Sequence, residues 1–109
     1  MTPDGRTDAL IADLLEVLDK AARLADRGRA SLDEDEALPL AFEAICNRVG
    51  DIAKKLMEID SARFADSVWR KAAQNRDFVV HQYHRLDLDT LWITVTKSFA
   101  ELRDRIPTG

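Results

Sequence analysis

The sequence predicts an all-α fold, an antiparallel four-helix bundle with room for one additional short helix. Apolar residues recur at three- and four-residue steps in four stretches, the spacing that places them on one face of a helix. The chain has only four glycines and three prolines in 109 residues, and 46% of it is hydrophobic, which does not suit a sheet rich in turns. Helices joined by short connections bury their apolar faces against one another, so a bundle is expected.

The first helix is expected to begin at Thr7 or Asp8, because either side chain suits a helix N-terminus. Residues 1–6 show no apolar periodicity, so we expect a flexible lead-in there and a single domain over residues 7–109. Gly28 ends the helix. The helix carries two apolar stripes, which predict contacts on two sides: Leu10, Leu14, Val17, Ala21 and Leu24 form one, and Ile11, Leu15, Leu18 and Ala22 form the other.

The main second helix is expected to start near Pro39, which fits a first helical turn, and to run to about Asp60. Before it, Ser31 and Glu34 have the spacing of a capping box. Cys46 is the single cysteine, which excludes an internal disulfide and predicts a small core residue. The apolar stripe of this helix consists of Ala41, Ile45, Val49, Ile52, Leu56 and Ile59.

Two further helices complete the expected bundle. The third is shorter and begins near Arg63 or Asp66. The fourth takes Asp87 or Asp89 as its cap and ends at Pro107. The residues that these helices turn inward are Phe64, Val68 and Trp69 in the third, and Leu88, Trp92, Val95, Phe99, Leu102 and Ile106 in the fourth.

An arginine, an imidazole and a phenol occur within eight residues at Arg76, His81 and Tyr83, in a chain that has two histidines and one tyrosine. Arginine presents a fork of donors to phosphate oxygens, and histidine exchanges a proton near neutral pH. Together they are a minimal set for phosphodiester chemistry without a metal. A surface arginine beside a histidine at a helix end explains the same residues about equally well.

The spacing of these residues constrains their geometry. At about 100° per residue, seven steps bring Tyr83 to within about 20° of Arg76, whereas five steps leave His81 about 140° away. Either the helix ends or distorts before His81, or a second copy of the chain supplies the missing partner across an interface. The sequence leaves both alternatives open.

Charge is distributed unevenly along the chain. The net charge of −4 argues against a protein that coats DNA, because nonspecific nucleic-acid binding depends on phosphate neutralisation. Residues 63–86 nevertheless carry an excess of three positive charges, from Arg63, Arg70, Lys71, Arg76 and Arg85 against Asp66 and Asp77. Such a basic patch suits an RNA strand that leads to one site, although a solvated helix face explains it almost as well.

The pattern Arg-x4-His-x-Tyr, formed here by Arg76, His81 and Tyr83, resembles the signature of the HepT-like branch of the HEPN superfamily. The resemblance extends over roughly Asp8 to Ile106. Three flanking segments agree: residues 67–71 resemble the family's Trp-Arg segment, residues 86–92 its Asp-Leu-x-x-Trp segment, and residues 49–56 its Gly-Glu-Ala-x-x-x-Leu helix.

Two positions depart from the family pattern. Asp77 stands where HepT proteins often have asparagine, and Asp51 stands where the family has glutamate. The resemblance implies that Arg76 and His81 are catalytic, with Asp77 and Asp51 in supporting positions. The shorter side chain of Asp51 would change its reach toward the arginine.

The resemblance also implies a function and partners. It implies a HEPN-like homodimer whose motifs meet at a shared cleft, acting as the endoribonuclease toxin of a type VII-like toxin-antitoxin pair without a cofactor or metal. A partner nucleotidyltransferase antitoxin would place AMP on Tyr83. RNA, not DNA, is the expected substrate. The alternative is a noncatalytic nucleotide-binding or scaffold subunit of a nucleotidyltransferase complex.

The expected location is cytoplasmic. No apolar run approaches the length that spans a membrane, and the N-terminus lacks the apolar core of a signal peptide. We therefore expect no association with a membrane.

Overall fold

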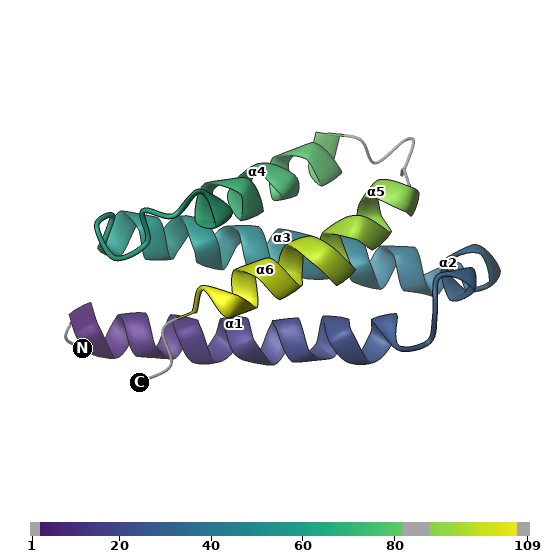
Figure 1. Ribbon diagram of the computed structural model, residues 1–109, viewed down its shortest axis with the longest axis horizontal. Coiled ribbons are helices and arrows are strands. Elements are labelled where there is room, and N and C mark those ends of the chain that lie inside the picture. The colour runs from purple at the N-terminus through teal and green to yellow at the C-terminus, as the bar shows by residue number, and fades with distance from the viewer. Residues whose placement is uncertain (1–2, 82–87, 107–109) are drawn as a thin grey trace.

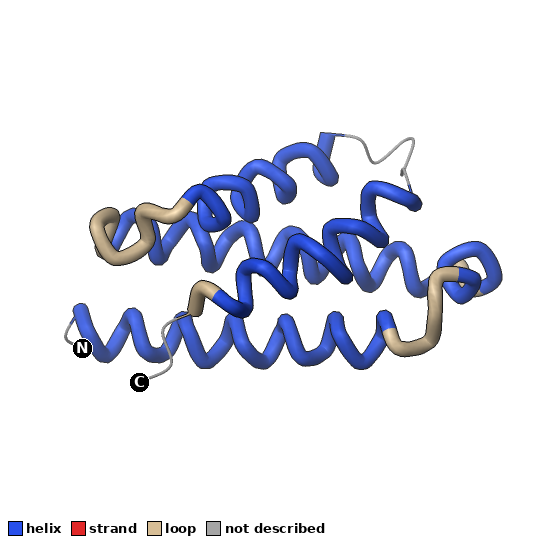
Figure 2. Tube along the Cα trace, in the orientation of Figure 1, coloured by secondary structure: helices blue, strands red, loops and turns tan. Residues whose placement is uncertain are grey.

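Helices form all the regular structure that the computed structural model describes, which covers the backbone of residues 3–81 and 88–106 and the side chains of residues 5–74 and 88–106. The long elements are α1 (Pro3–Ala25), α3 (Ala37–Ile59) and α4 (Ser67–His81), with the short α2 (Ala30–Glu34) between the first two. A C-terminal rod joins α5 (Leu88–Ile93), the π-helical segment η1 (Thr94–Ser98) and α6 (Phe99–Asp104) without a break (Figures 1 and 2). The predicted all-α bundle is confirmed, and α2 is the additional short helix.

The long helices run antiparallel to their neighbours in sequence. Among the described elements, α3 and α4 make the most extensive contacts, and α1 packs along the other side of α3. The C-terminal rod crosses these helices diagonally and contacts all three (Figure 1). No helix in the described ranges combines the length and apolarity needed to cross a membrane.

The core lies where the rod covers the three long helices. Most of the predicted apolar stripes are buried there. The buried hydrophobic residues are Ile11, Leu14, Leu18 and Ala21 from α1, Leu32 from α2, Leu38, Phe42, Cys46, Val49, Ile52, Ala53 and Leu56 from α3, Phe64 from the α3–α4 turn, Trp69 and Ala72 from α4, and Leu91, Val95, Phe99, Leu102 and Ile106 from the C-terminal region. Leu10, Val17 and Leu24 are only partly buried against this cluster.

The expected start of the first helix is wrong. Helix α1 already begins at Pro3, so residues 3–6 are helical rather than a flexible lead-in. Proline is favourable in the first helical turn, where its missing N–H is not needed. Thr7 lies inside the helix and only 3% of it is exposed, so it is not a cap. The helix ends at Ala25, and the turn that follows uses Gly28, whose φ of 92° suits glycine.

The predicted capping box at Ser31 is also wrong. Ser31 lies within α2, and its hydroxyl donates a 2.8 Å hydrogen bond back to the carbonyl of Arg27. Asp35 serves the next helix instead, since its carboxylate accepts a 2.9 Å bond from the N–H of Ala37. That bond, with the guanidinium of Arg27, lowers the pKa of Asp35. Pro39 lies in the first turn of α3 as predicted.

Helix α4 begins after Asp66, one of the two predicted starts. The carboxylate of Asp66 accepts a 3.1 Å bond from the N–H of Val68, which satisfies a donor that the helix leaves free. Trp69 is 1% exposed and meets Phe64 edge to face, with ring centroids 4.8 Å apart at 80°. The first turns of α4 are therefore fixed by both a cap and an aromatic contact.

The start of the C-terminal rod differs from the prediction in one respect. Asp89 lies inside the first turn of α5 and not before it, while Asp87 lies outside the described residues. Farther along, the hydroxyls of Thr94 and Thr96 donate to the carbonyls of Thr90 and Trp92, at 2.9 and 2.7 Å. Such bonds bend helices, and here they occur at the π-helical segment η1. The apolar periodicity of the sequence did not predict this segment.

Cys46 is a core residue, as predicted. Only 2% of it is exposed, and burial, with a smaller effect of Glu43, raises the pKa of its thiol to about 12. The thiol therefore stays neutral at physiological pH, which suits packing and not chemistry.

Replacing Trp69 by alanine should destabilise the protein by about 3–5 kcal/mol, because it removes a fully buried indole and leaves Phe64 facing a cavity. Urea denaturation followed by far-UV circular dichroism measures this loss. Trp92→Ala is the matched control, since Trp92 is only partly buried and its removal should cost clearly less. Equal costs for the two substitutions would contradict the anchoring role of Trp69.

Candidate functional site

Two of the three motif positions, 76 and 81, fall on the C-terminal half of α4. The backbone is α-helical without interruption from Ser67 to His81, so the helix does not end or distort before His81. This removes one of the two alternatives that the spacing left open. The side chains of Arg76, Asp77 and His81 lie outside the described residues, and Tyr83 lies outside them entirely.

Helical register places positions 76 and 81, which the sequence predicts to be catalytic, on different stripes of α4. Position 76 continues the line of Trp69 and Ala72, which are both buried. Position 81 continues the line of Arg70 and Gln74, which are both exposed. One copy of α4 therefore does not bring positions 76 and 81 to a common face.

Asp51 lies on α3 at the same level as position 76. It is eight residues before the end of α3, about 12 Å, and position 76 is nine residues after the start of α4, about 14 Å. Since the two helices are antiparallel neighbours, these levels correspond. Asp51 is half-buried. The arrangement is compatible with a supporting role toward Arg76, which stays a prediction.

Asn47 is a polar residue near this level that the sequence analysis missed. It precedes Asp51 by one helical turn, so the two share a side of α3. Its side-chain oxygen is buried and accepts no hydrogen bond, an unusual state for a buried acceptor. One asparagine beside an apolar stripe gives a weak sequence signal, and its burial became visible only in the fold.

Ion pairs in the described residues gather on α1, α2 and the elements that contact them. They are Glu16–Lys20, Asp13–Arg48, Asp19–Arg103, Arg27–Asp35, Arg29–Asp33 and Arg29–Asp89, with Asp66–Arg105 near the start of α4. Four exposed cations on α3 and α4, namely Lys54, Lys55, Arg70 and Lys71, make no ion pair there. The first half of α4, residues 67–74, therefore presents two cations without an ion-pair partner, Arg70 and Lys71.

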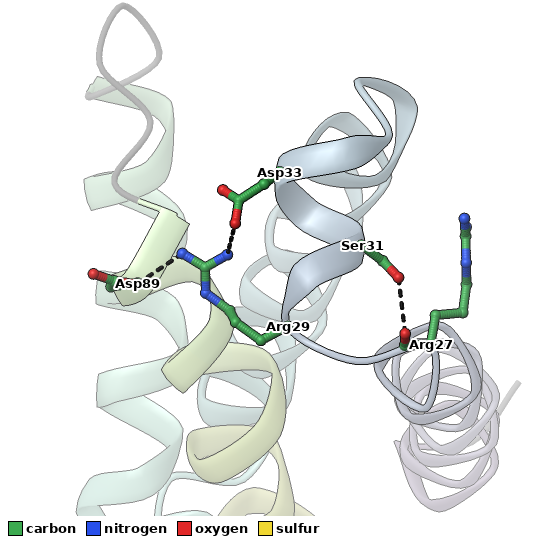
Figure 3. A network of polar contacts seen from close by, with 5 residues as sticks. All are labelled: Arg27, Arg29, Ser31, Asp33 and Asp89. Carbon is green, nitrogen blue, oxygen red and sulfur yellow. Dashed lines mark hydrogen bonds and ion pairs between the residues drawn. The ribbon is translucent and has the colours of Figure 1, made fainter.

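A polar network lies at the first turn of α5, the first element described after the motif. Arg29 donates a 2.7 Å hydrogen bond to Asp89 and a 3.2 Å bond to Asp33 (Figure 3). The hydrogen bond with Asp89, assisted by Asp33, raises the pKa of the Arg29 guanidinium. The network connects the α1–α2 corner to the first turn of α5, six residues after α4 ends.

A cavity of about 320 Å³ lies elsewhere, between α1 and the C-terminal rod. Its walls are mainly apolar: Leu18, Ala22, Ala25, Val95, Phe99 and Ala100, with Thr96, Asp26 and Arg103 as the polar members. Arg103 is paired with Asp19. Among its lining residues the cavity offers neither an imidazole nor an unpaired cation, the groups on which the predicted chemistry depends.

Metal ligands are not grouped in the part of the chain that is described. No set of three or more His, Cys, Asp or Glu residues there is arranged to hold a metal ion. Because the side chains of Asp77 and His81 are outside this part, metal independence stays a prediction.

Comparison with known proteins identifies the family. A family model described as ribonuclease HepT-like matches residues 14–108, which include the α3 segment, the whole of α4 and the C-terminal rod. No curated protein and no solved structure matches the chain. The family match covers nearly the entire sequence and contains the Arg-x4-His-x-Tyr motif. The chain therefore belongs to the HepT-like ribonuclease family.

Proposed function

We propose that this protein is a cytoplasmic, metal-independent endoribonuclease that acts as the toxin of a type VII-like toxin-antitoxin pair. The observation that carries the proposal is the Arg-x4-His-x-Tyr motif, whose positions 76 and 81 lie on α4, in a chain that belongs to the HepT-like ribonuclease family. The uncompensated cations on the same helix support an anionic substrate.

The motif residues have distinct roles in the proposed reaction. The ribose 2′-oxygen attacks the adjacent phosphorus, and the bond from phosphorus to the 5′-oxygen of the next nucleotide breaks. His81 takes the proton from the 2′-hydroxyl or gives one to the leaving 5′-oxygen, a contribution of roughly 10²–10⁴-fold. Arg76 binds the phosphate and stabilises the charge that develops on its oxygens. DNA lacks the attacking hydroxyl and is not cut.

A homodimer completes this site in our proposal. Positions 76 and 81 lie on different stripes of an uninterrupted helix. A second copy of α4 would bring its own position 81 toward position 76 of the first protomer. Each dimer would then hold two sites, each built from Arg76 of one chain and His81 of the other.

Tyr83 is the proposed point of control. The partner nucleotidyltransferase would transfer AMP from ATP to the phenol oxygen, with pyrophosphate as the leaving group and loss of the phenol proton. The new phosphodiester would place a negative charge and a bulky nucleoside near the phosphate site. It would neutralise Arg76 and exclude RNA.

Substitution of the motif residues should abolish RNA cleavage while leaving the fold intact. Without its proton-transfer group, His81→Ala should lose about 10²–10⁴-fold in rate, and Arg76→Ala about 10²–10³-fold through lost charge stabilisation. Cleavage of a labelled single-stranded RNA, with EDTA present and a DNA of the same sequence in parallel, measures both effects. Arg23→Ala on α1 is the control and should cleave normally.

Two results would contradict the nuclease. Cleavage of the DNA at the same rate would exclude chemistry that uses the 2′-hydroxyl. Full activity of His81→Ala would exclude the imidazole. A protein that binds nucleotide, leaves RNA intact and does not arrest growth on expression would instead be the noncatalytic module.

Mixing the two inactive variants should restore activity if the site forms across the dimer. A heterodimer of Arg76→Ala with His81→Ala keeps one site in which both residues are intact, so about half of the wild-type activity per heterodimer is expected. Co-expression with two different affinity tags and tandem purification yields this species. A heterodimer as inactive as either homodimer would show that each site is built within one protomer.

Co-expression with the partner nucleotidyltransferase should add AMP units to the wild-type protein and silence it. Tyr83→Phe should stay unmodified and toxic, since it lacks the acceptor oxygen. Intact-mass spectrometry and a growth assay measure the two effects together. Silencing of an unmodified wild-type protein would show that the partner inhibits by binding alone.

A further inference from the structure

A second cavity, of about 210 Å³, lies at the turn between α3 and α4. Its apolar members are Met57, Phe64 and Ala65, and its polar members are Ser61, Asp66 and Arg70. Phe64 is buried and Met57 half-buried, whereas Ser61 and Arg70 are exposed. The cavity therefore opens beside Arg70, the arginine of α4 that lies nearest the turn.

Arg70 has no carboxylate partner in this cavity. Asp66, the acid that shares the cavity with it, accepts the N–H of Val68 and pairs with Arg105 at 3.3 Å. The residue that precedes Arg70 in α4, Trp69, is buried against Phe64 and holds the backbone in place. Arg70 is thus a cation on a rigid support whose nearby acid is already engaged.

Lys54 adds a second cation on the facing helix. It precedes Met57 by three residues, so it lies on the same side of α3 as this wall of the cavity. It is exposed and makes no ion pair with the described residues. Along the helix axes, Lys54 is about 8 Å from the end of α3 and Arg70 is about 5 Å from the start of α4. Because the two helices are antiparallel neighbours, the heights of these two residues along the bundle differ by less than one helical turn.

We propose that Arg70 and Lys54 bind phosphates of an RNA strand to one side of the bond that is cut. Arg70 is about 9 Å from position 76 and about 16 Å from position 81 along the axis of α4. By helical register, position 81 continues the line of Arg70 and Gln74, which are exposed, so a strand that lies along this line passes both Arg70 and position 81. A guanidinium and an ammonium bind phosphate oxygens without reading the base. The proposal rests on the proposed ribonuclease function, since it takes the substrate from there.

The test is a comparison of binding and cleavage in charge-neutralised variants. Binding is measured by fluorescence anisotropy with a single-stranded RNA that is 2′-O-methylated throughout and so is not cut, across a salt series. Cleavage is measured with the unmodified RNA. The variants are Lys54→Gln, Arg70→Gln and the double variant, and Arg23→Gln with Lys97→Gln is the matched control, because both control residues are exposed and make no ion pair in the described structure.

The double variant should bind about tenfold more weakly at low salt, which corresponds to about 1.4 kcal/mol. The slope of log affinity against log salt should shrink by about 1.4, since two phosphate contacts are lost on a single strand. KM should rise while kcat at saturating RNA stays unchanged, because neither cation touches the reacting atoms. Arg70→Lys should keep part of the affinity, and the control double variant should behave as wild type.

Three outcomes separate this proposal from the ribonuclease function. Wild-type cleavage with unchanged KM and salt slope in the Lys54/Arg70 double variant would overturn the phosphate contacts and leave the nuclease standing. Binding that depends on Arg70 and Lys54 without any cleavage would support the contacts and overturn the nuclease. A fall in kcat with unchanged KM would overturn the proposal, since it would place these residues in the chemical step.

Discussion

The packing of Trp69 against Phe64 is the constraint on which the rest of this structure depends. The aromatic pair closes the turn between α3 and α4 and sets the rotation of α4 about its axis. Once that rotation is fixed, helical periodicity determines which later positions continue the buried stripe and which continue the exposed one. The placement of the motif positions 76 and 81 therefore follows from a contact about two to three turns earlier in the helix.

The two ends of α4 are secured by different means. At its start, Asp66 caps the backbone while Trp69 and Phe64 bury their rings. In α5, the next element described, Leu91 is buried in the core, and an exposed network of Arg29 with Asp33 and Asp89 adds polar contacts at the first turn (Figure 3). Exposed ion pairs stabilise little but orient the groups they join. The buried rings at the start of α4 therefore contribute more to stability than these exposed ion pairs do.

Apolar periodicity predicted the bundle because each of these helices buries its apolar face against the others. Leu14, Val49, Leu56 and Leu102 fell on predicted stripes and are buried. The helix ends were harder to predict, since a capping residue is defined by the backbone around it. Ser31 had the right spacing for a cap, yet it lies inside α2, and its hydroxyl donates to the carbonyl of Arg27. The N–H of Ala37, at the start of α3, is bonded by Asp35 instead. The π-helical segment also escaped prediction, because its hydroxyl-to-carbonyl bonds are satisfied locally and leave no apolar pattern.

For the site, the sequence identified the residue types and predicted that positions 76 and 81 point in directions about 140° apart on a straight helix. The structure shows that the helix is continuous between these positions. A helix that stays regular through His81 offers no local way to turn position 81 toward position 76. In the described part of α4, Trp69 and Ala72 pack into the core. Arg70 and Lys71 face solvent and make no ion pair there. In the proposed mechanism, a single chain therefore folds around its own core without forming a complete site. In the proposed dimer the missing proximity comes from a second helix with the same division, so activity would depend on assembly while folding of the chain would not.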